Sequence, residues 1–210
     1  SMMYKFLEKY SKKIDYYVPC RYKEGYGISF KGIDYAHKHN FSLIIALDCG
    51  IRAIDQIDYA KNKQIDFIIC DHHTPSNQIP SAHSILNPKQ VDCQYPYKDL
   101  SGCGVGFKFI QAYCIHKNIP LEEAYIFLDL VTISIGADIV PIDGENRVLA
   151  FYGMQKINSN PSIGVKALMM QALKSKEIKM SDIIFGIAPR INAAGRIDQA
   201  KKAVELLIEK

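Results

Sequence analysis

Two continuous runs of apolar residues give the clearest structural signal in the chain. The run Leu43–Leu47 leads into Asp48-Cys49-Gly50, and the run Phe67–Cys70 leads into Asp71-His72-His73. Residues 52–63, between the runs, repeat apolar side chains at helical spacing. Strands that are apolar on both faces and are joined by an amphipathic helix are typical of a parallel βαβ unit. We therefore predict a parallel sheet with polar residues at its carboxyl edge, where open α/β sheets bind ligands.

The rest of the pattern is increasingly helical. Tyr16–Pro19 is a short β-like run that ends at proline, and residues 74–100 are rich in Pro, Asn, Asp and Ser, which predicts a long loop. An amphipathic helix is expected to close the chain from about Gln199. The other predicted helices cover residues 32–39, 105–117, 121–134, 146–157 and 163–173.

These elements define the expected fold class. We predict an α/β fold with a parallel sheet flanked by helices, followed by a second half that is mostly helical. Residues 1–140 would form the α/β core and residues 141–210 the helical part. No segment with the composition of a linker separates the two parts.

Composition changes this picture little. The chain has 210 residues, 48% of them hydrophobic, and a net charge of +4, which permits contact with a polyanion without arguing for it. No apolar run has the length of a membrane span or of the core of a signal peptide. The six cysteines show no CxxC spacing, so we expect reduced thiols in a cytoplasmic protein.

Asp48 and Asp71 follow the two strands that are expected to be neighbours. Adjacent parallel strands lie about 4.8 Å apart, and two carboxylates at that spacing repel each other unless a cation lies between them or one is protonated. His72 and His73 add nitrogen ligands, and a mixed Asp/His set suits Mn²⁺, Fe²⁺ or Zn²⁺ better than Ca²⁺. The alternative is that the aspartates cap strand ends and the histidines are ordinary loop residues.

Three other stretches carry candidate chemistry. Asp138 follows an apolar helix, where the helix dipole disfavours a carboxylate, so it marks either a local cation or an exposed turn. The Gly102–Gly106 segment, with Gly104 at its centre, has glycines at alternate positions and suits either phosphate binding through its N–H groups or a tight turn. Arginine is a natural bidentate partner for phosphate. The candidates of this kind are Arg21 and, in an expected loop over residues 189–196, Arg190, Asn192 and Arg196.

Taken together, these motifs resemble those of the DHH phosphoesterase superfamily. Asp71-His72-His73 after an apolar strand, preceded by Leu47–Gly50, carries the resemblance. Further stretches resemble the RecJ branch, in the same order along the chain. They are Val18–Arg21 with Glu24–Gly27, Gly102–Gly106, Gly136–Pro141 with Glu145–Arg147, and Pro189–Arg196.

The resemblance implies an exonuclease that degrades single-stranded DNA from the 5′ end in recombination and repair, with two divalent metals, Mn²⁺ or Mg²⁺. It also implies single-stranded DNA as substrate, and a single-strand-binding protein and a helicase as pathway partners. By the same resemblance, Asp48 would bridge the metals and His72 and Asp138 would complete the second metal's shell. His73 would face the scissile phosphate and Asp71 would orient the histidines. Arg21, Arg190, Asn192 and Arg196 would lie near the DNA backbone.

The sequence departs from the RecJ pattern in one respect. An aspartate-rich motif on an earlier strand, which should supply the remaining ligands, is absent, and so are the nucleic-acid-binding modules that follow the phosphoesterase domain in this branch. We therefore expect residues 1–210 to be a truncated DHH domain that binds metal weakly and is inactive alone. Two alternatives remain: a DHH-type oligonucleotide or cyclic-dinucleotide phosphodiesterase or pyrophosphatase, and a metal-free scaffold relative that binds DNA.

Overall fold

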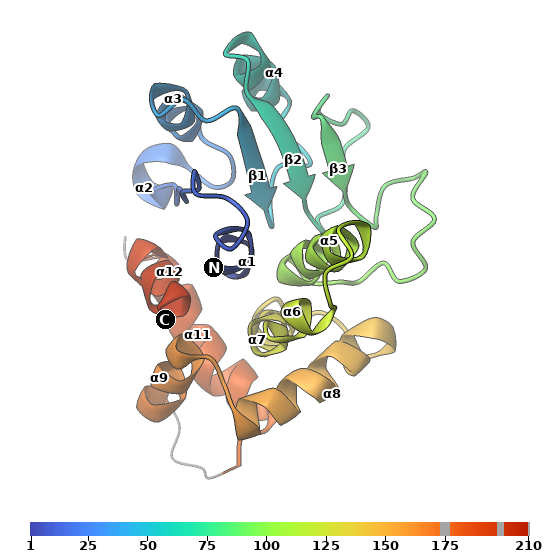
Figure 1. Cartoon of the computed structure of the whole chain (residues 1–210), viewed down its shortest axis with the longest axis vertical. Helices are drawn as coiled ribbons and strands as arrows, with labels where there is room; N and C mark the ends of the chain where they lie inside the picture. The colour runs from blue at the N-terminus through green and yellow to red at the C-terminus, as the bar shows by residue number, and fades with distance from the viewer. Residues whose placement is uncertain (173–176, 197–199, 210) are drawn as a thin grey trace.

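A small sheet with its covering helices lies at one end of the molecule, and a larger group of helices lies at the other (Figure 1). The computed structural model describes residues 1–172, 177–196 and 200–209. Its strands are β1 (Leu43–Leu47), β2 (Asp66–Cys70) and β3 (Ser84–Leu86). Its helices are α1 (Met2–Leu7), α2 (Arg21–Glu24), α3 (Phe30–Lys38), α4 (Ile54–Asn62), α5 (Gly102–His116), α6 (Glu122–Tyr125), α7 (Leu128–Ala137), α8 (Gly144–Ser159), α9 (Ile163–Ala172), α10 (Met180–Asp182), the π-helical turn η1 (Ile183–Ile187), α11 (Ala188–Arg196) and α12 (Ala200–Ile208).

The sheet is parallel, with strand order β1-β2-β3, which confirms the predicted fold class. Helix α4 connects β1 to β2, as the βαβ pattern predicts. Leu47 pairs with Cys70 at the last position of both strands. Asp48 and Asp71 therefore leave the sheet side by side, at the edge that points toward the middle of the molecule (Figure 1).

Side chains alternate between two hydrophobic clusters along β2. Phe67 and Ile69 are buried with residues of α3 and α4, including Ile33 and Ile57. Cys70 is buried in the other cluster, which joins α1, α5, α7, α8 and η1. The strand is apolar on both faces because each face packs against helices. The carboxyl ends of the strands consequently lie where the sheet meets the helical part.

One strand lies inside the segment predicted as a loop. Residues 84–86 form β3, which pairs in parallel with β2 from Ser84 opposite Ile68 to Leu86 opposite Cys70. Three residues are too short for a hydrophobic period to be read from sequence. The loop prediction for residues 74–100 is therefore wrong at β3, whose structure comes from pairing with a neighbouring strand.

Two glycine- or proline-containing segments predicted as loops are helical. Gly102–Gly106 forms the first turns of α5, where Ser101 Oγ accepts a hydrogen bond from the N–H of Gly104 at 3.1 Å as a helix N-cap. Pro189 lies at the second residue of α11, directly after the π-helical turn η1, and the helical run continues through it to Arg196. The loop predicted over residues 189–196 is therefore wrong.

Other helical predictions differ at their boundaries. The helix predicted over residues 121–134 is two helices, α6 and α7, separated at Ile126 and Phe127. The helices predicted over 32–39, 146–157 and 163–173 are present as α3, α8 and α9, although residue 173 lies outside the described residues. Gln199, the predicted start of the last helix, also lies outside them, and α12 is described from Ala200.

The first residues of the chain and its surface complete the description. Tyr16–Pro19 forms no strand, and in the described part of the chain β1 is an edge strand of the sheet.

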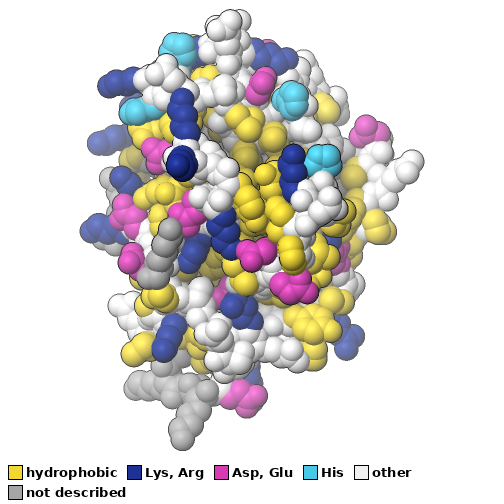
Figure 2. Space-filling view, in the orientation of Figure 1, with side chains coloured by type: hydrophobic (Ala, Val, Ile, Leu, Met, Phe, Trp, Pro, Cys, Tyr) yellow, Lys and Arg dark blue, Asp and Glu magenta, His cyan; other side chains and the backbone are white. Residues whose placement is uncertain are grey.

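Among the described helices, none is long and apolar enough to cross a membrane. All six cysteines are free thiols. Figure 2 shows Lys and Arg side chains dispersed over the face in view among acidic ones, as expected from a small net charge. The division at residue 140 stays a prediction.

Candidate metal centre

Asp48 is the first residue after β1 and has an unusual backbone conformation. Its N–H donates to the carbonyl of Cys70 at 2.8 Å, which continues the sheet by one residue. Its φ is 62°, in the left-handed region, and Gly50 follows at φ 114°. Aspartate tolerates this region better than most residues. The turn directs the carboxylate to His72, whose Nε2 lies 3.1 Å from Asp48 Oδ1.

His72 is held in one orientation by a backbone carbonyl. Its Nδ1 lies 3.0 Å from the carbonyl oxygen of Leu100, which fits donation of the Nδ1 proton. A neutral imidazole in that tautomer leaves the Nε2 lone pair facing Asp48, as in histidine ligands of metals. Contact with the Asp48 carboxylate raises the pKa of His72 and outweighs the burial that lowers it.

Asp71 is a buried carboxylate that organises the residues around it. Its Oδ1 accepts from the N–H groups of His72 at 2.8 Å and His73 at 3.2 Å, and lies 2.7 Å from His73 Nδ1. Its Oδ2 accepts from the N–H of Ile51 at 3.0 Å. Burial alone would raise the pKa of Asp71, but these hydrogen bonds together lower it. Asp71 therefore fixes His73 with its Nε2 directed away from Asp71.

Asp138 is the C-cap residue of α7, which packs on the far side of the site from the sheet's own helices α3 and α4 (Figure 1). Its Oδ2 accepts from Gly102 N–H at 3.3 Å and Ser134 Oγ at 3.1 Å. Although Asp138 as a whole is exposed, burial of its carboxylate first and the Asp48 carboxylate second raise its pKa, while His72 lowers it. Two carboxylates, one after β1 and one at the end of α7, thus both affect the charge of His72.

The site fits a divalent cation. Asp48, His72 and His73 each offer one ligand atom, and these atoms lie within 4.8 Å of one another. Asp48 Oδ1 is buried, and the nitrogen nearest to it, His72 Nε2 at 3.1 Å, carries a proton only when His72 is protonated, so with neutral His72 this oxygen has no hydrogen-bond donor. A buried carboxylate oxygen without a partner is costly, and a cation would supply the missing partner. The mixed Asp/His set matches the preferences of Mn²⁺, Fe²⁺ and Zn²⁺.

Gly102 is part of this site, although no sequence pattern singles it out from the other glycines. A Cβ at this position would lie 2.0 Å from Asp48 Oδ1. Its N–H also donates to Asp138. Only glycine therefore lets α5 begin directly against the Asp48 carboxylate. The packing that brings α5 to β1 joins residues far apart in sequence, so no local pattern could have revealed this contact.

The structure brings some predicted nucleic-acid contacts near the site and gives others different roles. The guanidinium of Arg21, in α2, lies 5.5 Å from the centre of the Tyr26 ring. The N–H of Gly104 is used by Ser101 within α5, which leaves it no proton for a phosphate. Arg190 Nη1 donates to the Gly186 carbonyl at 2.6 Å, one turn earlier along the helix.

The last two predicted contacts lie on α11. Asn192 is exposed and lines a cavity beside α7. Arg196 is the last residue of α11, and its side chain lies outside the described residues. The predicted DNA-contacting residues thus lie on two sides of the centre, α2 and α11, and their roles stay predictions.

Tyr26 lies in the Gly25–Gly27 turn, which the resemblance places near the DNA backbone, and it is close enough to the candidate ligands to be affected by their charge. Burial first, and then the charges of Asp48, Cys49, Asp71 and Asp138, raise the pKa of Tyr26. The residue is nevertheless 69% exposed. In the sequence, the signal for this residue was its position between Gly25 and Gly27, which both adopt positive φ in the structure.

Glu24 holds the Arg21–Tyr26 segment in place. Its carboxylate accepts hydrogen bonds from Tyr17 Oη at 2.8 Å, Cys20 N–H at 2.9 Å and Ser29 Oγ at 2.7 Å. Burial alone would raise the pKa of Glu24, but these bonds together lower it. The segment that carries an aromatic ring and a guanidinium to the site is therefore fixed through one carboxylate.

We expect Glu24→Ala to weaken binding of single-stranded DNA by the complete protein about five- to tenfold, because hydrogen bonds to a charged group each contribute roughly 1.5–3 kcal/mol when shielded and less when solvated. Mn²⁺ affinity should not change, since Glu24 contacts no candidate ligand. Fluorescence anisotropy and calorimetry measure the two affinities. Glu122→Ala, at an exposed position of α6, is the matched control. Unchanged strand affinity in Glu24→Ala would show that the Arg21–Tyr26 segment is not part of the binding surface.

Comparison with known proteins places this site in a family. Residues 1–135 match the DHH family, N-terminal domain. The chain belongs to the DHH family. The matched residues include Asp48 and Asp71-His72-His73 and end just before Asp138.

Curated relatives from the DHH family resemble the chain over nearly its whole length. The single-stranded-DNA-specific exonuclease RecJ of Bacillus subtilis (strain 168) is 39% identical over 209 residues, which cover 99% of this chain and 26% of that protein. RecJ of Escherichia coli (strain K12) is 37% identical over 206 residues, which cover 93% of this chain and 36% of that protein. The resemblance to RecJ predicted from the motifs is confirmed. The chain spans about a quarter to a third of these relatives.

Solved structures of DHH-family proteins agree with the fold. A crystal structure of exonuclease RecJ bound to manganese has a TM-score of 0.88 and 27% identity, covering 99% of this chain and 52% of that one. RecJ from Thermus thermophilus in complex with Mn²⁺ has a TM-score of 0.83 and 25% identity, covering 100% of this chain and 30% of that one. Both structures hold the metal that the Asp/His set of this chain suits.

Proposed function

We propose that this DHH-family chain is the metal-binding part of a longer exonuclease that degrades single-stranded DNA from the 5′ end. One observation carries the proposal: ligand atoms of Asp48, His72 and His73 lie within 4.8 Å of one another, and Asp48 Oδ1 is buried without a hydrogen-bond partner when His72 is neutral. Likeness to RecJ proteins over 99% of the chain supports single-stranded DNA as the substrate. Because the chain spans only part of those relatives, the activity is proposed for the complete protein.

The proposed roles follow from the contacts of each side chain. Asp48, His72 and Asp138 would hold a divalent cation, Mn²⁺ or Mg²⁺. Asp48 and His72 belong to the group whose ligand atoms lie within 4.8 Å of one another, with His73 as its third member, and Asp138 is close enough for both to change its pKa. When bound, such cations supply a Lewis acid and activate water for attack on phosphorus. His73, whose Nδ1 is fixed by Asp71, would present Nε2 to the scissile phosphate.

The residues around the centre would position the strand. Tyr26 is exposed above the carboxylates and suits stacking on a base, and Arg21 beside it suits a phosphate contact. Arg190, Asn192 and Arg196 would contact the strand from α11. In the cell we expect this protein in the cytoplasm, with a single-strand-binding protein and a helicase as partners in recombination and repair.

A comparison of hydrolysis rates for different substrates tests the proposal. The complete protein with Mn²⁺ should release mononucleotides from a 5′-phosphorylated single strand whose 3′ end is blocked. It should spare the same sequence as a duplex, and chelation by EDTA should stop release. Faster hydrolysis of a cyclic dinucleotide or of pyrophosphate than of the long strand would favour the alternative DHH substrates. Strand binding without hydrolysis or Mn²⁺ binding would indicate a scaffold relative.

A further inference from the structure

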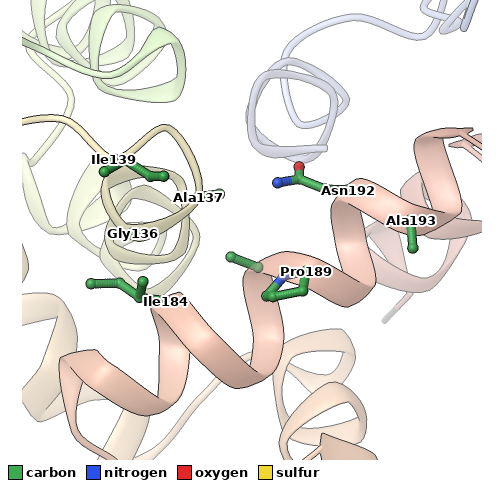
Figure 3. Close-up of a pocket in the computed structure, with 8 residues that line it drawn as sticks. Gly136, Ala137, Ile139, Ile184, Pro189, Asn192 and Ala193 are labelled. Carbon is green, nitrogen blue, oxygen red and sulfur yellow. The ribbon is translucent and has the colours of Figure 1, made fainter.

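A cavity of about 320 Å³ opens at the C-terminal end of α7, the helix that Asp138 caps. It lies between the C-terminal end of α7 and the helical run of η1 and α11 (Figure 3). Its volume falls within the range of roughly 300–1,000 Å³ that is usual for small-molecule sites. Asp138 lies in the chain between two of its lining residues. The lining residues are Gly136, Ala137, Ile139, Ile184, Ala188, Pro189, Asn192 and Ala193.

Ile139 is the most unusual residue of this cavity. It follows Asp138, the C-cap of α7, and its φ is 53°. Helices often end in this left-handed conformation, but with glycine or asparagine, and a β-branched residue is strained there. The residue is nevertheless 81% exposed, so packing within the chain does not account for the strain. Strained residues of this kind concentrate at ligand-binding sites. An exposed, strained isoleucine next to Asp138 therefore indicates a ligand contact rather than a core position.

The rest of the lining is small and apolar. Gly136 keeps the cavity floor close to η1, because a Cβ there would lie 2.9 Å from Ile183 Cγ2. In Figure 3, Ile139 lies on one side, and Pro189 and Asn192 lie on the helix opposite. The amide of Asn192 is the one polar side chain among the lining residues of this cavity, and it can both donate and accept hydrogen bonds.

An apolar wall faced by a single amide matches the chemistry of a nucleobase. Each base has an apolar π-face and a polar edge, and stacking on that face is tolerant of sequence. One amide that donates and accepts can meet the edge of any of the four bases. The cavity adjoins Asp138, so a nucleoside held in it would lie next to a phosphate at the metal centre.

We propose that this cavity receives the nucleobase adjacent to the scissile phosphate, with Ile139 packed on the face of the base and Asn192 bonded to its edge. The inference rests on the proposed function and extends it, because it assigns a base-holding subsite on the helical side of the centre. The strain at Ile139 is then the cost of presenting an apolar side chain to the substrate.

Ile139→Asn separates this role from a role in folding. Asparagine tolerates positive φ, so the variant should melt at the same temperature as the wild type or higher. The complete protein carrying it should hydrolyse an oligothymidylate with Mn²⁺ about tenfold more slowly, and bind the strand about tenfold more weakly in EDTA by anisotropy. Asn192→Ala should weaken binding in the same direction. Ile115→Asn, at an exposed isoleucine of α5 away from the cavity, is the matched control.

Strands with one stable abasic nucleotide, placed in turn at each position near the 5′ end, test the occupant. The wild type should hydrolyse the strand about tenfold more slowly when the abasic nucleotide stands at one particular position. In Ile139→Asn, the abasic nucleotide at that position should cause no further fall in rate. An equal fall in rate in both proteins, or no fall in the wild type, would contradict the proposed subsite. A marked fall in melting temperature of Ile139→Asn would assign Ile139 to packing and also overturn it.

A substrate without a nucleobase separates this inference from the proposed function. A phosphate ester with no aromatic ring for the cavity, a 5′-phosphorylated strand made only of stable abasic nucleotides, should be hydrolysed with Mn²⁺ equally by the wild type and by Ile139→Asn. A wild type that hydrolyses neither this ester nor strands refutes the proposed function. A wild type that degrades strands without sensing the abasic position refutes the base subsite alone.

Discussion

Asp48→Asn should abolish strand hydrolysis by the complete protein while leaving its fold intact. Asparagine adopts positive φ as readily as aspartate, so the turn after β1, at φ 62°, is preserved. The substitution removes the charge that faces His72 Nε2 at 3.1 Å. Loss of an outer partner of a metal ligand typically costs about 10–100-fold, and we expect loss of the ligand itself to exceed about 100-fold in turnover and in Mn²⁺ affinity.

The measurements are single-turnover hydrolysis of a 5′-phosphorylated strand and calorimetric titration with Mn²⁺. Asp66→Asn is the matched control, because Asp66 is exposed at the opposite end of β2, paired with Leu43. Both variants remove one negative charge, so their general attraction for DNA changes equally. Strand binding in EDTA should be kept in both. Full turnover in Asp48→Asn would contradict the site.

Gly102→Ala should lower turnover and Mn²⁺ affinity to a comparable extent, although it replaces no candidate ligand. A Cβ at residue 102 would lie 2.0 Å from Asp48 Oδ1 and 2.4 Å from its Cγ, so either the carboxylate or α5 must move. We expect Mn²⁺ affinity and turnover to fall at least about 100-fold, at the upper end of what displaced ligand partners cost. Alanine is otherwise favourable at the start of a helix.

Gly106→Ala in the same helix is the control for Gly102→Ala. A Cβ at Gly106 would meet its nearest atoms, in Leu47 and Met2, at 3.5 Å, which is ordinary van der Waals contact. This variant should keep its activity and gain up to about 1 kcal/mol in helix stability. Equal Mn²⁺ affinity in both variants would show that the close approach of α5 to Asp48 is not required.

The parts of the fold that were predictable are those whose signal is local. β1, α4 and β2 follow from two apolar runs and an amphipathic segment, and their parallel pairing places Asp48 beside Asp71. β3 has three residues, too few for a pattern, and forms because β2 offers it a hydrogen-bonding partner. The helical start of α5 was missed because glycines disfavour helices on average, while Ser101 caps this one.

The grouping of Asp48, His72 and His73 was predictable from the sequence, and the surroundings of these residues were not. Asp71 and the two histidines are adjacent in sequence, so their grouping needs no tertiary information. The contact of Gly102 with Asp48, the exposure of Tyr26 and the strain at Ile139 depend on packing between distant segments and on backbone angles. None of these has a signature in residue type alone.

The left-handed backbone at Asp48 also bears on how the proposed activity could be lost. Side chains other than glycine, asparagine and aspartate are strained at such an angle. Most replacements at this position would therefore impair folding as well as chemistry, and the damaged protein would be removed. Asparagine and glycine would leave a folded, inactive protein that still occupies strand ends. Naturally silenced descendants of this chain should therefore carry one of these two residues at position 48.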